Sequence, residues 1–183
     1  MSLRTLSDHV ADICQNSIKA GASRVILKVD ETLDVFSFKV EDNAGGMPKE
    51  ILKRIYDPFY TTRDKKIRKV GLGIPFLKTA AESTGGHLDI ESEEGIGTTL
   101  SVLIKKSHID CQPVGDLAGT FFTLITTDQS IHWEIKRTYN EEEYEIDTEK
   151  LFDNQADKKL WENPSFLKII RESLYEMENA IKD

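Results

Sequence analysis

Asp42 stands where a carboxylate could meet a ligand, because a predicted strand ends there and a glycine-rich turn begins. Apolar and polar side chains alternate over residues 36–41, the pattern of a half-buried strand. Gly45 and Gly46 would let the backbone approach a flat ligand. A carboxylate here can accept a hydrogen bond from an exocyclic amine such as that of adenine. The same residues are also ordinary turn residues, so the motif alone leaves both interpretations open.

A second group of polar side chains gathers on the first predicted helix, which begins at Leu6 and is ended by Gly21. At about 100° per residue, His9, Asp12 and Asn16 fall within a sector of about 60°. They could face a ligand, or they could simply face water. The other side of the helix is a stripe that we expect to join the core, formed by Leu6, Val10, Ile13, Cys14 and Ser17.

Two further glycine motifs lie later in the chain. Residues 71–73 (Gly-Leu-Gly) open a predicted helix, and a glycine loop at a helix N-terminus offers free N–H groups to a phosphate. The basic run 65–69 before it has no regular period and is predicted to be an exposed loop. Residues 95–98 (Gly-Ile-Gly-Thr) join two predicted strands around 88–90 and 100–104.

The order of predicted elements up to residue 106 is a helix, two strands, a helix, a loop, a helix and two strands. The first two strands, 24–30 and 36–42, should form an antiparallel hairpin. This order favours an α+β fold, a two-layer α/β sandwich in which helices cover a mixed, mostly antiparallel sheet. We therefore predict that residues 1–106 form the first domain.

Residues 107–183 differ in character and are predicted to form a C-terminal α+β extension of unknown role. Two interpretations remain for it: a small second domain, which is the preferred one, or a layer that completes the core of the first domain. Its predicted elements are an apolar helix over 115–126, a hairpin formed by 131–139 and 144–147, and helices over 151–161 and 164–182.

Charge and composition limit the partners of the chain. Its 183 residues are 39% hydrophobic and 31% charged, which is typical of a globular protein, and the formal net charge is −8. This acidic balance argues against nucleic acid as a partner. Cys14 and Cys111 suggest neither a disulfide framework nor a zinc site. We expect a cytoplasmic protein without a membrane span, because no apolar run approaches the roughly 20 residues that cross a bilayer and no signal-peptide core is present.

Four motifs follow one another in a fixed order: Asp12-x-x-x-Asn16, Asp42-x-Ala44-x-Gly46, Gly71-x-Gly73 and Gly95-x-Gly97-Thr98. With them, residues 6–105 resemble the GHKL superfamily of ATP-binding domains. Its members include sensor histidine kinases, anti-sigma-factor kinases, type II topoisomerases, mismatch-repair ATPases and the ninety-kilodalton heat-shock chaperone. The resemblance implies a Bergerat-type, histidine kinase-like ATP-binding fold, with ATP and Mg²⁺ as cofactors.

At the adenine end, the resemblance implies that Asp42 binds the adenine amine and that Gly46 lets the backbone approach the ring. Thr98 matches a threonine that assists at the adenine, often through water. Ala44 and Met47 belong to the same cofactor-binding segment. Ala44 replaces the first glycine of the usual Asp-Asn-Gly-x-Gly motif, which should be tolerated if its φ is negative.

At the phosphate end, Asn16 matches the helix asparagine that ligates Mg²⁺, and an amide oxygen suits this hard ion. Gly71, Leu72 and Gly73 match the segment beside the phosphates. Residues 57–63 resemble the F box that precedes the ATP lid. Arg63 and the lysines after it would then be lid residues that meet phosphate charge, or else part of a solvated basic loop.

Asp12 lies one turn before Asn16, where ATP-hydrolysing and serine-kinase members of the superfamily carry a glutamate. A carboxylate there can orient or deprotonate the attacking water or hydroxyl, so Asp12 is the predicted catalytic residue. Because only a handful of residues precede the first helix, we expect the phosphoacceptor hairpin of a sensor histidine kinase to be absent. His9 is a poor candidate for a phosphoacceptor, because it lies inside the helix that faces the nucleotide.

The leading hypothesis is a stand-alone Mg²⁺-ATP-binding protein that hydrolyses ATP or phosphorylates a protein partner. The extension would hold that partner or a second copy of the chain in a homodimer. The alternative is a non-catalytic, ATP-sensing regulatory module in which lid closure changes a contact with a protein. A DNA-acting ATPase is disfavoured by the acidic charge balance.

Overall fold

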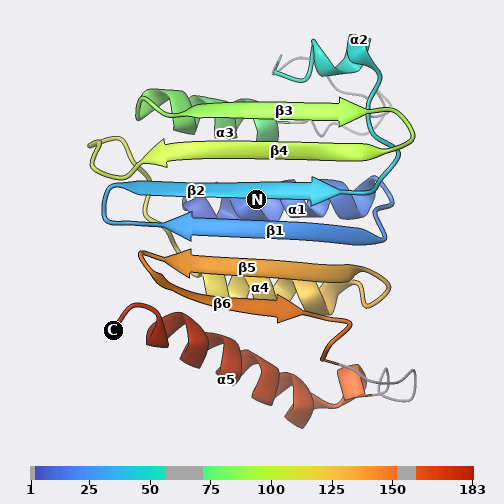
Figure 1. Cartoon of the computed structure of the whole chain (residues 1–183), viewed down its shortest axis with the longest axis vertical. Coiled ribbons are helices and arrows are strands. Elements are labelled where there is room, and N and C mark those ends of the chain that lie inside the picture. The colour runs from blue at the N-terminus through green and yellow to red at the C-terminus, as the bar shows by residue number, and fades with distance from the viewer. Residues whose placement is uncertain (1–2, 57–71, 152–159) are drawn as a thin grey trace.

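The computed structural model of the chain describes residues 3–56, 72–151 and 160–183 (Figure 1). The strands among these residues are β1 (Arg24–Glu31), β2 (Val35–Asp42), β3 (His87–Glu93), β4 (Gly97–Lys105), β5 (His132–Tyr139) and β6 (Glu142–Asp147). The helices are α1 (Leu6–Lys19), α2 (Lys49–Leu52), α3 (Gly73–Ser83), α4 (Leu117–Thr127) and α5 (Pro164–Ala180).

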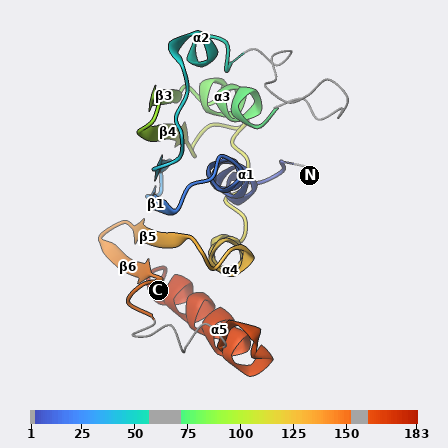
Figure 2. The ribbon, with the colours of Figure 1, turned by 90° about the vertical axis from the view of Figure 1, so that its right-hand side faces the viewer.

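The six described strands form one sheet in the order β3-β4-β2-β1-β5-β6. All neighbouring pairs are antiparallel except β1 and β5, which run parallel. Helices α3, α1 and α4 lie side by side in a second layer on one face of the sheet, and α5 packs against α4 (Figure 2). The predicted α+β sandwich with a mixed, mostly antiparallel sheet is therefore confirmed.

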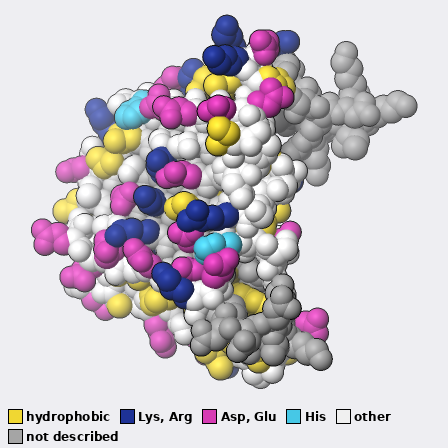
Figure 3. Space-filling model, turned by 45° about the vertical axis from the view of Figure 1, so that its right-hand side comes forward, with side chains coloured by type: hydrophobic (Ala, Val, Ile, Leu, Met, Phe, Trp, Pro, Cys, Tyr) yellow, Lys and Arg dark blue, Asp and Glu magenta, His cyan; other side chains and the backbone are white. Residues whose placement is uncertain are grey.

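The two faces of the sheet differ as the alternation of the strands predicts. The side chains that point toward the helices are buried, Val25, Leu27 and Val29 on β1 among them. The other face carries charges of both signs, with ion pairs such as Lys39–Glu41. Figure 3 shows basic and acidic side chains interspersed over the surface. Because these charges are hydrated easily, only one face of the sheet needs a covering layer.

The extension adds strands β5 and β6 to the sheet of the first domain. Strand β5 pairs with β1 along its whole length, and Trp133 and Ile135 of β5 belong to the same buried cluster as the residues of β1 and β2. We therefore interpret residues 107–183 as the layer that completes the first core, the second of the two alternatives. The predicted helix 151–161 lies largely outside the described residues. No described helix is both long and apolar enough to cross a membrane.

A buried ionic network fastens α5 to the sheet. Arg137 on β5 is fully buried; it donates hydrogen bonds to Glu31 of β1 and, at 3.1 Å, to Glu178 of α5. Glu178 also accepts from the Tyr144 hydroxyl at 2.9 Å and lies 2.8 Å from the Lys182 ammonium. Burial alone would raise the pKa of Glu178, but the hydrogen bonds from Arg137 and Lys182 hold it below its usual value.

Replacing Arg137 with leucine should lower the free energy of unfolding by about 3–5 kcal/mol, because Glu31 and Glu178 would stay buried without their shared cation. Denaturant titration measures this. Arg24→Leu is the matched control, since Arg24 is exposed and pairs with Glu134 at the surface, and it should cost much less. Equal losses in the two variants would contradict the argument.

Candidate functional site

Asp42 ends β2 with its carboxylate held in a defined orientation. One oxygen, Oδ2, accepts a hydrogen bond of 2.6 Å from the Ser17 hydroxyl on α1. The other, Oδ1, accepts one of 3.0 Å from the Ala44 N–H. An ionised carboxylate has about four acceptor positions, so about two remain for a ligand. Burial and the charge of Asp42 raise the pKa of the Cys14 thiol, which stays protonated at neutral pH.

Two glycine turns interlock beside Asp42. Gly46 has φ +63°, and a Cβ placed on it would lie 2.0 Å from the Glu93 carbonyl oxygen. A Cβ on Gly97 would lie 1.9 Å from the carbonyl oxygen of Asp42 itself. Neither position can therefore hold a side chain unless the backbone moves. Among the described non-glycine residues only Asn140 has a positive φ, so the φ of Ala44 is negative. This is the condition under which alanine can replace the first glycine of the motif.

Strand register places a row of side chains across the sheet next to Asp42. Asp42 is the partner of Val25 on β1 and of Thr98 on β4, and Thr98 is the partner of Ser92 on β3. Directly paired residues point to the same face, so Thr98 is the neighbour of Asp42 on the side that faces α1. Ser92 bonds to the Thr98 hydroxyl at 2.9 Å and accepts from the Met47 N–H at 2.8 Å.

Asp12 of α1 lies against the first residue of α3. A Cβ on Gly73 would lie 1.8 Å from Asp12 Oδ2, so the carboxylate fills the space beside the Gly73 Cα. Asn16 lies one turn further along α1, and both side chains are half-buried. Leu72 occupies the N-cap position of α3, without a capping bond from its side chain. Arg63 and Gly71, which were also predicted to bind the cofactor, lie outside the described residues.

The first turn of α1 is capped from two directions. The Asp8 N–H bonds to the Thr5 hydroxyl at 3.2 Å, and the Asp8 carboxylate bonds back to the Thr5 N–H in a capping box. The first two N–H groups of α1 donate to carbonyls of the connector, which is the segment 106–116 between β4 and α4. These two bonds run from Leu6 to Pro113 at 2.9 Å and from Ser7 to Val114 at 2.8 Å.

His9 does not face water, although its place in a polar sector allowed that interpretation. It is only 2% exposed, and its Nε2 lies 2.9 Å from Oε1 of Gln112 in the connector. Gln112 donates from its Nε2 to the Leu3 carbonyl, so its Oε1 is the acceptor and His9 carries its proton on Nε2. Burial lowers the pKa of His9, and this effect is larger than the increase that the hydrogen bond to Gln112 causes.

Two residues of the site were not singled out from the sequence. Ser17 was assigned to the core stripe, and it is indeed buried, but its hydroxyl orients Asp42. Its position directly after Asn16 was the available signal. Ser92 has no comparable signal, because only the register of β3 against β4 brings it to Thr98.

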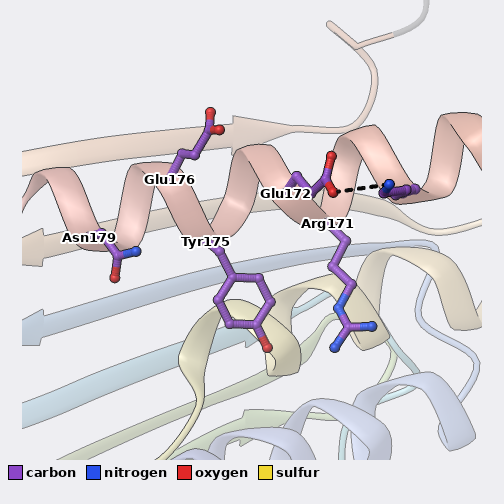
Figure 4. A pocket seen from close by; sticks show the side chains of 6 residues that line it. Arg171, Glu172, Tyr175, Glu176 and Asn179 are labelled. Carbon is purple, nitrogen blue, oxygen red and sulfur yellow. Dashed lines mark ion pairs between the residues drawn. The ribbon is translucent and has the colours of Figure 1, made fainter.

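A separate shallow concavity lies on α5, beyond β5 and β6 (Figure 4). It contains the ion pair between Lys168 and Glu172, with 3.6 Å between the charged atoms. None of the predicted site residues lines it, so it is not the place where the sequence motifs meet. Its lining residues are Lys168, Arg171, Glu172, Tyr175, Glu176 and Asn179.

Fold and site together define a class of protein. One helix layer covers one face of a mostly antiparallel sheet, a strand-end carboxylate stands among glycine turns, and an Asp/Asn helix faces the start of α3. This is the architecture of an ATP-binding domain. The family model of histidine kinase-, DNA gyrase B- and HSP90-like ATPases matches residues 2–108, more than half of the chain, and the chain belongs to this family.

Curated relatives include two bacterial kinases. The sensor kinase CckA of Brucella abortus is 32% identical over 110 residues, which cover 52% of this chain and 12% of that protein. Sporulation kinase C of Bacillus subtilis is 35% identical over 95 residues, which cover 51% of this chain and 22% of that protein. The chain thus spans less than a quarter of the length of either relative.

Solved structures include one of similar fold. The crystal structure of the N-terminal domain of a DNA repair protein superposes with a TM-score of 0.52 at 16% sequence identity. The likeness covers 78% of this chain and 51% of that one. This share is larger than residues 2–108, so the likeness in fold continues into the extension.

Gly73→Ala should destabilise the chain by about 1 kcal/mol, the low end for overpacking, because the new methyl group would overlap the Asp12 carboxylate and push this side-chain end aside. In an Asp12→Ala background the same change should cost much less, and this double-mutant cycle can be measured by denaturant unfolding. Gly45→Ala is the control, since a Cβ there meets nothing within 4 Å. Additive effects of Gly73→Ala and Asp12→Ala would refute the contact.

The stability of the chain should fall as the pH drops below about 6.5, partly because of His9. Its lowered pKa means that the unfolded chain binds a proton there before the folded chain does. One such group contributes a slope of at most about 1.4 kcal/mol per pH unit. His9→Gln should flatten this part of the pH–stability curve, whereas His87→Gln, at an exposed position, should not. Identical curves for His9→Gln and wild type would count against a buried neutral His9.

Proposed function

We propose that this chain binds Mg²⁺-ATP and either hydrolyses it or transfers its terminal phosphate to a protein partner. The observation that carries the proposal is the orientation of Asp42. Ser17 and Ala44 hold its carboxylate, which keeps free acceptor positions beside a turn that comes close to β3 and β4. These acceptors suit the exocyclic amine of adenine, and the absence of a Cβ on Gly46 suits a flat ring.

The phosphate end offers oxygen donors that fit Mg²⁺. Asn16 has an amide oxygen one turn after Asp12, and both side chains are half-buried. Within residues 3–56, 72–151 and 160–183, no three His, Cys, Asp or Glu side chains come together as a metal site. This suits an ion held by Asn16 together with phosphate oxygens and water, because Mg²⁺ usually keeps several waters. The bound ion would neutralise part of the phosphate charge.

Asp12 would be the residue that acts on the nucleophile. Its carboxylate lies at the start of α3, where the N–H groups of the first turn favour a phosphate. From there it would orient a water or a protein hydroxyl toward the terminal phosphate and accept its proton. Aspartate is one methylene shorter than the glutamate of related enzymes, so a small movement of α1 or α3 would set its reach.

A second function, a non-catalytic ATP sensor, is favoured by one contact. The connector of the extension caps the first turn of α1 and holds His9 through Gln112. A change at the nucleotide could therefore reach the extension through this helix without any chemistry. In either function we propose a cytoplasmic signalling role in which the extension contacts a protein partner or a second copy of the chain.

Nucleotide binding and ADP formation, measured on the same variants, test these proposals. Asp42→Ala should abolish ATP binding, and Asn16→Ala should mainly remove its dependence on Mg²⁺. Asp12→Asn should bind ATP as wild type does but form ADP at least about 100-fold more slowly, the usual scale for losing a general base. Asp34→Ala, at an exposed position near the other end of the β1–β2 hairpin, is the control.

The outcomes separate the two functions. ATP binding by Asp42→Ala would defeat the assignment of the adenine end. If wild type binds ATP but forms no ADP, with or without candidate protein substrates, the catalytic function is excluded and the non-catalytic ATP sensor is supported. An unchanged rate of ADP formation in Asp12→Asn would remove Asp12 from the mechanism.

A further inference from the structure

The Ser92 hydroxyl on β3 uses all of its hydrogen-bonding capacity. It donates its proton to the Gly97 carbonyl at 3.0 Å, because a carbonyl oxygen can only accept. It accepts from the Met47 N–H at 2.8 Å, because a backbone N–H can only donate. Its third partner is the Thr98 hydroxyl at 2.9 Å. A hydroxyl oxygen has one proton and two lone pairs, so one lone pair is left for Thr98.

This count fixes the direction of the bond between the two hydroxyls. Since the Ser92 proton is engaged with Gly97, Thr98 must donate its proton to Ser92. The Thr98 oxygen then has only lone pairs to offer to anything else. A threonine that could otherwise rotate to donate or accept is thereby held as an acceptor.

Thr98 and Asp42 therefore offer the same kind of group to a ligand. They are direct partners across β4 and β2, and directly paired side chains lie about 5 Å apart on one face. Asp42 is an acceptor because Ser17 and the Ala44 N–H both donate to it. The two side chains form a patch that has acceptors and no free donor.

We propose that Ser92 is a specificity-determining residue that makes this patch select a 6-amino purine over a 6-oxo purine. The inference rests on the proposed function, in which the purine lies at Asp42. An amino group at position 6 donates to both acceptors. A carbonyl oxygen in the same place would face two acceptors and find no donor, which is how a hydrogen-bonding site rejects the wrong ligand.

The affinities of ATP and inosine 5′-triphosphate, measured with Mg²⁺ present, provide the test. Wild type should prefer ATP. In Ser92→Ala the Thr98 hydroxyl is released and can turn its proton toward the 6-oxo group, so the preference should fall about tenfold. Ser92→Thr keeps a hydroxyl at this position and should therefore retain most of the preference for ATP. Ser101→Ala, which changes a serine of β4 at a position that pairs with Lys39 on β2, should leave the preference unchanged.

A second variant separates specificity from simple loosening of the turn. Thr98→Val removes the acceptor but leaves the Ser92 bonds to Met47 and Gly97 in place, and it should also lower the preference. Adding Ser92→Ala to Thr98→Val should then change the ratio no further. A purely structural role of Ser92 would weaken both nucleotides equally and keep their ratio.

Each outcome decides the question. Equal weakening of both nucleotides in Ser92→Ala overturns the inference but leaves the proposed function standing. Equal affinity of wild type for both nucleotides also overturns it, again without touching the proposed function. Failure of wild type to bind either nucleotide removes the proposed function, and the inference falls with it.

Discussion

The hydrogen bond between Ser17 and Asp42 is the contact on which the site depends. It joins the helix layer to the end of β2 at 2.6 Å and, together with the buried stripe of α1, fixes the rotation of this helix above the sheet. One residue along a helix corresponds to a turn of about 100°, so a slip of α1 by one position would carry Asp12 and Asn16 away from α3. The same bond orients the Asp42 carboxylate. This contact therefore bears on both ends of the site.

The extension holds the same helix at its other end. The connector accepts hydrogen bonds from the first two N–H groups of α1, and Gln112 holds His9. Strand β5 covers the edge of β1 that would otherwise be exposed, and β6 with α5 closes the far side. Helix α1 is thus held by β2 near its C-terminus and by the extension near its N-terminus. This is why the residues after 106 matter to the site.

The sequence predicted the elements well because burial on one face leaves a periodic pattern. Alternation in β1 and β2 and the helical stripe of α1 correspond to buried side chains in the structure. The place of the extension in the sheet was not readable, since a parallel pairing between β1 and β5 joins residues more than 100 positions apart. Nothing local in either strand specifies that partner. The burial of His9 was not readable for a similar reason, because its partner Gln112 lies on a segment that periodicity cannot place.

By itself, the sequence determined which residue types could do chemistry and in what order: an Asp/Asn helix, a strand-end aspartate and three glycine motifs. The positions of Gly46 and Gly97 were readable because close backbone approach demands the absence of a Cβ. Only the tertiary structure decided which hydroxyls orient those groups. Ser17 and Ser92 look like any serine in a helix or strand, and their roles arise from bonds to Asp42 and Thr98 on other elements. Hydrogen-bond direction depends on every partner that surrounds an oxygen, and those partners meet only when the chain has folded.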